Sequence, residues 1–121
     1  MSYESTVYIV RKTDLHYGLK RYAEVVAMFD LSCYPPIANM MRNKKETDCL
    51  IYSDYGNTEI TEDRYGKALT EATPQDVIAV LEKAVANGSE YRRIFPLLSM
   101  LKSFEEHKGQ WEEIAVLHFG H

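Results

Sequence analysis

The sequence predicts an α+β fold in which a single, mostly antiparallel sheet carries helices packed on one face. Short runs of β-branched and aromatic residues, separated by turn-forming residues, indicate strands. Two stripes of apolar residues with a 3.6-residue period indicate a pair of helices after Thr73. The expected element order is β-β-α-β-β-β-α-α-β. With 121 residues, the chain is interpreted as a single α+β domain, 1–121, whose core is large enough to fold without a metal or disulfide.

The first two strands are expected at residues 6–12 and 21–31. Residues 6–12 place apolar side chains on both faces, so this strand should be covered on both sides. Residues 13–20 are interpreted as a loop. The spacing within residues 21–31 fits a helix as well as a strand, but the adjacent Val25-Val26 and the nearby Gly18 favour a strand paired with the first.

A short helix and a three-stranded meander are expected next. Consecutive prolines at Pro35-Pro36 end the second strand, and residues 36–43 form a helix whose inward side chains are Ile37, Met40 and Met41. Polar, Gly-containing turns then separate three further short strands, which are expected at residues 48–53, 58–62 and 67–70.

The helix pair and the last strand complete the fold. Thr73 and Pro74 have the chemistry of a helix start, and Asn87-Gly88 that of a helix end. A second helix follows Ser89, and Pro96 should either kink it or split it near Ile94. The kink is favoured because the apolar stripe continues across the proline. Residues 112–119 alternate as a closing strand, which would make both it and the first strand central if the two are neighbours.

Charge is distributed unevenly along the chain. The net charge is −4, and residues 46–71 alone carry seven acidic side chains against two basic ones. Direct nucleic-acid binding is therefore not expected, since it requires a surplus of Lys and Arg, whereas an acidic face for a basic partner is permitted. No signal peptide or long apolar run occurs, so a cytoplasmic protein without membrane contact is expected. Cys33 and Cys49 lack partner motifs and are expected to be buried, unpaired thiols.

Candidate functional residues are concentrated in the acidic middle of the chain. Phosphate-binding, dinucleotide, hydrolase and zinc-protease motifs are absent, and no cofactor or catalytic residue is assigned. Asp54 and Glu59 are expected to face each other across a hairpin, where clustered carboxylates could bind Mg²⁺ or Ca²⁺, solubilise an exposed turn, or form a docking face. Tyrosines among them suit a protein interface. The residues assigned to a partner-binding face are Asp48, Asp54, Tyr55, Glu59, Glu62, Asp63 and Tyr65.

Two further groups of residues are poorly suited to metal binding or to nucleophilic catalysis. His118 and His121 are three residues apart, a spacing that places them on opposite faces of a strand and does not suit a metal chelate; a partly buried His118 is expected instead. A nucleophilic cysteine would need an exposed thiol of lowered pKa, and the acidic neighbour Asp48 should raise the pKa of Cys49. No metal site is therefore assigned.

Several segments together resemble short uncharacterised proteins carried by phages and mobile elements of Gram-positive bacteria. The resemblance covers the MSYEST-VYIV opening, YAEVVAMFDL, TDCLIYSDYGNTEITEDRYG and the terminal VLHFGH. It implies a genomic setting in which small acidic proteins often look like inhibitors of host defence or regulators that bind a protein. It assigns no functional residues.

The sequence thus predicts a non-enzymatic protein-binding module. Its partner would be a protein, such as a host nucleic-acid-handling or defence protein with a basic surface, bound through the acidic, tyrosine-bearing face. Two alternatives remain open: a small metal-dependent hydrolase or nuclease using Asp48, Asp54 and Glu59, and a homo-oligomeric structural protein, for which a homodimer would bury the second face of the sheet.

Overall fold

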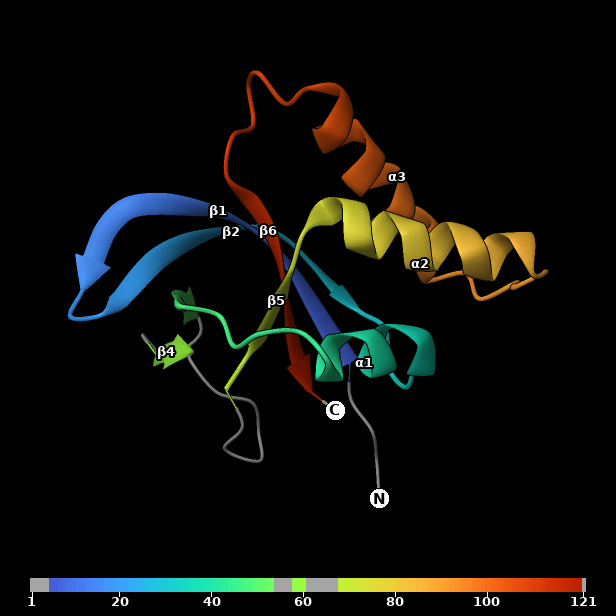
Figure 1. Ribbon diagram of the computed structural model, residues 1–121, viewed down its shortest axis with the longest axis horizontal. Coiled ribbons are helices and arrows are strands. Elements are labelled where there is room, and N and C mark those ends of the chain that lie inside the picture. The colour runs from blue at the N-terminus through green and yellow to red at the C-terminus, as the bar shows by residue number, and fades with distance from the viewer. Residues whose placement is uncertain (1–4, 54–57, 61–67, 121) are drawn as a thin grey trace.

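The computed structural model describes residues 5–53, 58–60 and 68–120, and within them the chain follows the predicted order of elements (Figure 1). The strands are β1 (Ser5–Tyr17), β2 (Lys20–Asp30), β3 (Cys49–Ser53), β4 (Thr58–Ile60), β5 (Thr70–Ala72) and β6 (Ile114–Gly120). The helices are α1 (Pro35–Arg42), α2 (Pro74–Ala86) and α3 (Ile94–Glu106). The α+β class predicted from the sequence is confirmed.

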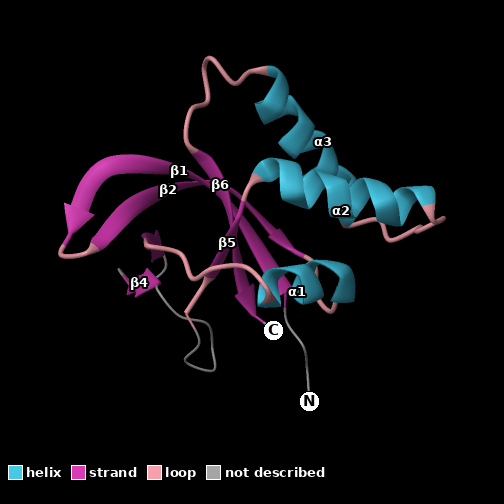
Figure 2. Ribbon diagram, in the orientation of Figure 1, coloured by secondary structure: helices cyan, strands magenta, loops and turns pink. Residues whose placement is uncertain are grey.

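The six strands of the described residues form one mixed sheet in the order β4-β3-β2-β1-β6-β5. All neighbouring pairs are antiparallel except β2 and β3, which are parallel and are connected through α1. β1 pairs with both β2 and β6, so the first and last strands are neighbours and neither lies at an edge of the sheet. Figure 2 shows how the long β1–β2 hairpin curves away from the helices.

The three helices share one core on a single face of the sheet. Val7 and Ile9 of β1 and Val116 of β6 point into this helix-covered core, which includes fully buried residues of α1, α2 and α3. The opposite face carries a second buried cluster, formed by Val10, Ala23, Cys49, Ile51, Leu69, Ala115 and Leu117. Side chains on both faces of β1 are therefore buried, which confirms the prediction for this strand.

The loop predicted at residues 13–20 is wrong. β1 continues to Tyr17 and β2 begins at Lys20, so only a two-residue turn separates them. Gly18 occupies a left-handed conformation, with φ of +61°, which permits so tight a turn without strain from a Cβ. The pairing of β1 with β2 is irregular between Lys12 and His16, and it continues beyond that irregularity to the turn.

The three-stranded meander is also wrong. β3 and β4 form a hairpin, but β5 pairs with β6 at the opposite edge of the sheet. β5 covers 70–72 rather than 67–70, and Ala72 is buried in the helix-covered core. Local turn signals placed a strand here, but the choice of partner depends on β6, which is distant in the sequence.

The helix pair begins as predicted and differs at Pro96. The Thr73 hydroxyl accepts a hydrogen bond from the Asp76 backbone N–H (3.2 Å), which confirms the N-cap of α2. α3 begins only at Ile94, so Pro96 lies in its first turn, where a missing N–H costs nothing, and the predicted kink is wrong. No helix within the described ranges is long and apolar enough to cross a membrane.

Candidate functional site

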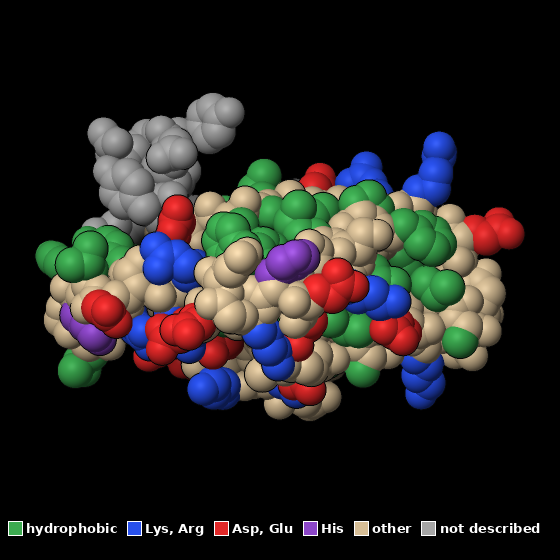
Figure 3. Space-filling view, turned by 90° about the horizontal axis from the view of Figure 1, so that it is seen from above, with side chains coloured by type: hydrophobic (Ala, Val, Ile, Leu, Met, Phe, Trp, Pro, Cys, Tyr) green, Lys and Arg blue, Asp and Glu red, His purple; other side chains and the backbone are tan. Residues whose placement is uncertain are grey.

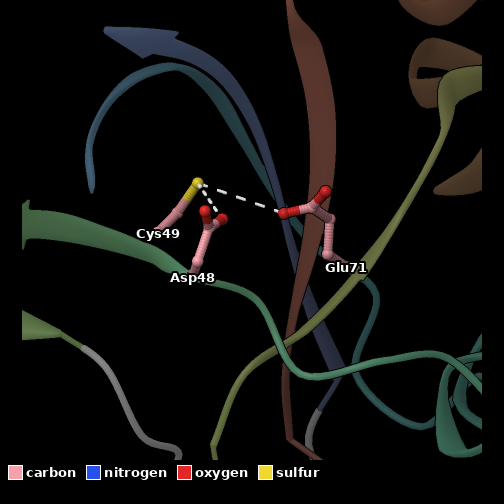
Figure 4. Close-up of side chains that lie close together, drawn as sticks. All are labelled: Asp48, Cys49 and Glu71. Atoms are coloured by element: carbon pink, nitrogen blue, oxygen red, sulfur yellow. Dashed lines mark hydrogen bonds between the residues drawn. The ribbon is translucent and has the colours of Figure 1, made fainter. Parts of the chain in front are cut away.

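Three side chains that could bind a cation converge where β3 begins. Asp48 immediately precedes β3, Cys49 opens it, and Glu71 reaches them from β5 (Figure 4). One ligand atom of each lies within 4.8 Å of the others. The Cys49 Sγ is 3.8 Å from Asp48 Oδ1 and 4.0 Å from Glu71 Oε1. We call this group, together with Thr47 and Lys12, the polar cluster.

Thr47 holds the polar cluster in place. It is buried, and its hydroxyl accepts a hydrogen bond from the Cys49 backbone N–H (3.0 Å) and donates one to Glu71 Oε1 (2.7 Å). The Thr47 backbone N–H donates to the carbonyl of Leu69 (2.9 Å). Because one threonine makes all three contacts, the start of β3 and the start of β5 are fixed relative to each other.

Lys12 supplies the positive charge of the polar cluster. Its Nζ lies 2.8 Å from Glu71 Oε2 and 3.7 Å from Asp48 Oδ1, and the Lys12 and Glu71 side chains are only 17% and 11% exposed. Burial acts to lower the pKa of Lys12, but the hydrogen bond and the charge of Glu71 outweigh burial and raise it. A metal ion at these carboxylates would therefore have to displace an ammonium group that is already paired with Glu71 and lies close to Asp48.

The same surroundings disfavour a nucleophilic role for Cys49. The thiol is fully buried, and burial raises its pKa, against the opposing effects of the Thr47 hydrogen bond and the Lys12 charge. Burial also acts to raise the pKa of Asp48, but the nearby charge of Lys12 outweighs it, and the pKa of Asp48 is lowered. The polar cluster thus has the properties of a structural charge network, with a protonated thiol and an ionised carboxylate.

The structure places only part of the predicted partner-binding face. Asp48 lies in the polar cluster with an exposed side chain. Glu59 lies in β4, and the strand register gives it Tyr52 as its partner where the sequence had suggested Asp54. The remaining residues of the predicted face lie outside the described residues: Asp54, Tyr55, Glu62, Asp63 and Tyr65.

The other singled-out residues have different surroundings. Cys33 is exposed, so the expectation that both thiols are buried is wrong for Cys33, which lies in the turn before α1. His118 is buried, and its Nε2 lies 2.5 Å from the Ser5 Oγ across the β1–β6 pairing. His121 lies outside the described residues. The serine and histidine are both nearly inaccessible to solvent, so their contact fastens β1 to β6.

The most exposed apolar side chains belong to the tip of the β1–β2 hairpin. Leu15, Tyr17 and Leu19 are 69%, 65% and 97% exposed, and we call them the hairpin tip. Figure 3 shows hydrophobic side chains at the left end of the molecule, the end that the hairpin occupies in Figure 1. Single exposed apolar residues are common on protein surfaces, but three within five residues concentrate exposed apolar area at one end of the hairpin, as interaction sites often do.

Polar contacts hold the base of the hairpin, directly below the hairpin tip. The Thr13 hydroxyl donates to the carbonyl of Tyr22 (2.8 Å), and Arg21 Nε donates to the carbonyl of Thr13 (2.6 Å). Arg21 also forms an ion pair with Glu113, which ties the hairpin to the segment before β6. Sequence reasoning missed this surface because it assigned residues 13–20 to a loop. A signal was present, since Leu15, Tyr17 and Leu19 are too apolar for an ordinary solvated loop.

Comparison with known proteins returned no match, whether with protein-family models, curated proteins or solved structures. Of the surfaces described above, the hairpin tip is accessible and apolar, whereas the polar cluster is occupied by its own ion pairs.

Proposed function

We propose that this chain is a non-enzymatic module that binds another protein through the end of the sheet where the β1–β2 hairpin and the start of β3 meet. The observation that carries the proposal is the exposure of Leu15, Tyr17 and Leu19 on a hairpin held by hydrogen bonds. Such a tip presents apolar area to a partner without a cost of ordering the loop on binding.

The hairpin tip can contribute a substantial part of the energy of an interface. Complete burial of a leucine or a residue of similar size contributes about 1.5–3 kcal/mol. Tyr17 adds a ring that buries a large area and loses little entropy, a combination enriched at interface hot spots. Three such side chains can therefore act as the central anchors of an interface, surrounded by polar residues.

The acidic segment, residues 46–71, extends this surface. β2 and β3 are paired so that Arg21 is opposite Cys49, and the Arg21 backbone N–H donates to the carbonyl of Asp48 (2.9 Å). The acidic segment therefore begins at the base of the hairpin. We propose that Asp54, Tyr55, Glu59, Glu62, Asp63 and Tyr65 continue from Asp48 as an acidic part of the same interface, which favours a partner with a basic surface.

The resemblance to proteins of phages and mobile elements suggests the class of partner. A small acidic protein in that setting is suited to inhibit a host protein that handles nucleic acid, because such a host protein carries the basic surface that an acidic face complements. We therefore propose a host nucleic-acid-handling or defence protein as the partner, bound directly and without involvement of nucleic acid.

The proposal is tested by replacing all three hairpin-tip residues with serine. The partner is first identified by capture from the host cell and is then purified, and its affinity for both chains is measured by calorimetry. We expect L15S/Y17S/L19S to weaken binding by about 100-fold or more, because at least two apolar anchors are lost. The melting temperature should be nearly unchanged, since these side chains are exposed in the free protein.

A matched control removes exposed apolar side chains from another part of the surface. Met28 and Met100 are 60% and 36% exposed and lie on β2 and α3, outside the hairpin tip. M28S/M100S should bind the purified partner with the affinity of the unchanged chain. Equal binding by all three proteins would refute the role of the hairpin tip. Light scattering provides a further check, since a stable dimer would favour the homo-oligomeric alternative.

The acidic part of the interface is tested separately. Reversal of charge in D54K/E59K/D63K should abolish or strongly weaken binding to a basic partner and leave the melting temperature nearly unchanged. The effect should decrease as ionic strength rises, because salt screens exposed charges. Full binding by the reversed chain would remove the acidic segment from the interface and leave the hairpin tip as the contact surface.

A further inference from the structure

A groove lies beside residues 107–113, the segment that connects α3 to β6. It runs between the start of α2, the end of α3 and residues 107–113, and its volume is about 330 Å³, within the usual range for ligand sites. The residues that line it include Pro74, Phe104, Glu105, Trp111, Glu112 and Ile114. We call it the Trp111 groove.

An aromatic wall with a fixed orientation forms one side of the groove. The Trp111 and Phe104 rings meet edge to face, with centroids 5.1 Å apart and planes at 78°. The Trp111 backbone N–H donates to the carbonyl of His107 (3.1 Å), which closes the turn after α3. Trp111 is nevertheless 38% exposed. A tryptophan held in this way and open to solvent provides a ready platform for a ligand.

The charge of the groove is negative and incompletely balanced. Glu105 is held by Lys108 Nζ and Gln75 Nε2, each at 3.0 Å. Glu113 forms its ion pair with Arg21. Glu112 also lines the groove and has no ion-pair partner among the described residues. One uncompensated carboxylate therefore follows Trp111 in the sequence and lines the same groove.

We propose that the Trp111 groove receives an arginine side chain from a basic segment of the partner protein. The guanidinium would stack on the Trp111 ring and pair with the Glu112 carboxylate, and its aliphatic stem would lie against Pro74 and Ile114. Arginine fits better than lysine because its planar, weakly hydrated cation both stacks on a ring and forms paired hydrogen bonds with a carboxylate.

An anionic ligand fits the same groove poorly. The start of α2 contributes some positive potential, but Pro74 has no N–H to donate, and the Asp76 N–H already donates to the Thr73 hydroxyl. The surplus of carboxylates would also repel an anion. The inference names the chemistry of the partner and therefore rests on the proposed function, although it concerns a different surface from the hairpin tip.

The chain contains a single tryptophan, so its fluorescence reports directly on the groove. The probe is a blocked peptide in which arginine alternates with glycine, and its comparison peptide carries citrulline, a neutral isostere, in place of each arginine. We expect a saturable change in Trp111 fluorescence with the arginine peptide and an affinity for the citrulline peptide that is about tenfold lower or weaker.

Two variants that each remove one negative charge test the role of the Glu112 carboxylate. E112Q should weaken arginine-peptide binding about fivefold or more, because it removes the charge beside the ring. E90Q removes the same charge from the exposed connection between α2 and α3, at the far end of both helices from the groove, and should leave the affinity unchanged. Both variants should keep the melting temperature of the unchanged chain, since both carboxylates are exposed.

Three results would overturn the inference: no saturable change with the arginine peptide, equal binding of the citrulline peptide, or equal losses in E112Q and E90Q. Each is distinguishable from failure of the proposed function. If the peptide does not bind while partner affinity still depends on the hairpin tip, only the arginine site is refuted. If the peptide binds and L15S/Y17S/L19S keeps full partner affinity, the hairpin assignment fails instead.

Discussion

Lys12 and Glu71 form a 2.8 Å ion pair between β1 and β5, two strands that lie on either side of β6. Glu71 is paired in register with Leu117 of β6, which belongs to the buried cluster on the face away from the helices. The pair therefore crosses β6 on that face, and it holds the short edge strand β5 against the centre of the sheet.

Removing Lys12 should destabilise the fold severely. In K12M the Glu71 carboxylate loses its cation while it remains only 11% exposed. Breaking a buried ion pair in this way typically costs about 3 kcal/mol or more, because the remaining charge is left uncompensated. Urea denaturation should show this loss as a lower midpoint with an unchanged slope.

A neighbouring exposed pair provides the control for K12M. Arg11 and Glu24 also lie 2.8 Å apart, but their side chains are 43% and 58% exposed. R11M should therefore cost less than about 1 kcal/mol. The double variant K12M/E71L should recover most of the stability that K12M loses, since no buried charge remains. Equal destabilisation by R11M and K12M would show that the Lys12–Glu71 pair contributes no more to stability than an exposed ion pair does.

Divalent metals should not stabilise the chain. Asp48, Cys49 and Glu71 are close enough together to suggest a cation site, but the Lys12 ammonium already lies between the carboxylates. Titration with Mg²⁺, Mn²⁺ or Zn²⁺ should give no saturable heat and no rise in melting temperature. Tight binding of one metal equivalent, lost in E71Q, would instead establish a metal site at Asp48, Cys49 and Glu71.

The order of elements could be predicted because its signals are local. Apolar periodicity, the Thr73 cap and the Asn87-Gly88 end are each contained within a few residues. Strand partners are not local. β5 was assigned to the wrong neighbours because its partner β6 lies more than 40 residues later. The kink predicted at Pro96 was wrong because apolar residues continue with a helical period on both sides of Ile94. The period therefore did not reveal where α3 begins.

The candidate site could be predicted only in part, for the same reason. Asp48 was identified from the acidic composition of its segment, but Lys12 and Glu71 are 59 residues apart and converge only in the folded sheet. One signal was available: Lys12 lies in a strand whose side chains are buried on both faces, and a charge in such a place requires a partner of opposite sign. The sequence did not show which acid would supply it.

Acidification should weaken folding through Asp76. The hydrogen bond from Lys44 Nζ (2.7 Å) is the main cause that lowers the pKa of Asp76, against a smaller opposing effect of burial. A carboxyl group with a lowered folded-state pKa contributes stability above its unfolded pKa and loses it as pH falls through the folded value. The contribution should therefore disappear below about pH 4.

Denaturation measured across this pH range tests the role of Asp76. D76N and K44M should both flatten the acid dependence of stability, because one removes the titrating group and the other its partner. The effect should be below about 1 kcal/mol, since the Asp76 side chain is 45% exposed. An acid dependence identical in both variants and in the unchanged chain would exclude the Lys44 contact as its source.

The cap of α2 provides the last test, because Thr73 is the single residue between β5 and the helix α2, which covers the sheet. Its hydroxyl accepts the Asp76 backbone N–H, one of the donors that has no partner within the helix. T73A should lower the free energy of unfolding by about 1 kcal/mol, whereas T73S keeps the acceptor and should cost much less. Thermal denaturation of the two variants measures the difference. Equal losses would mean that the threonine methyl group, rather than the cap, stabilises this junction.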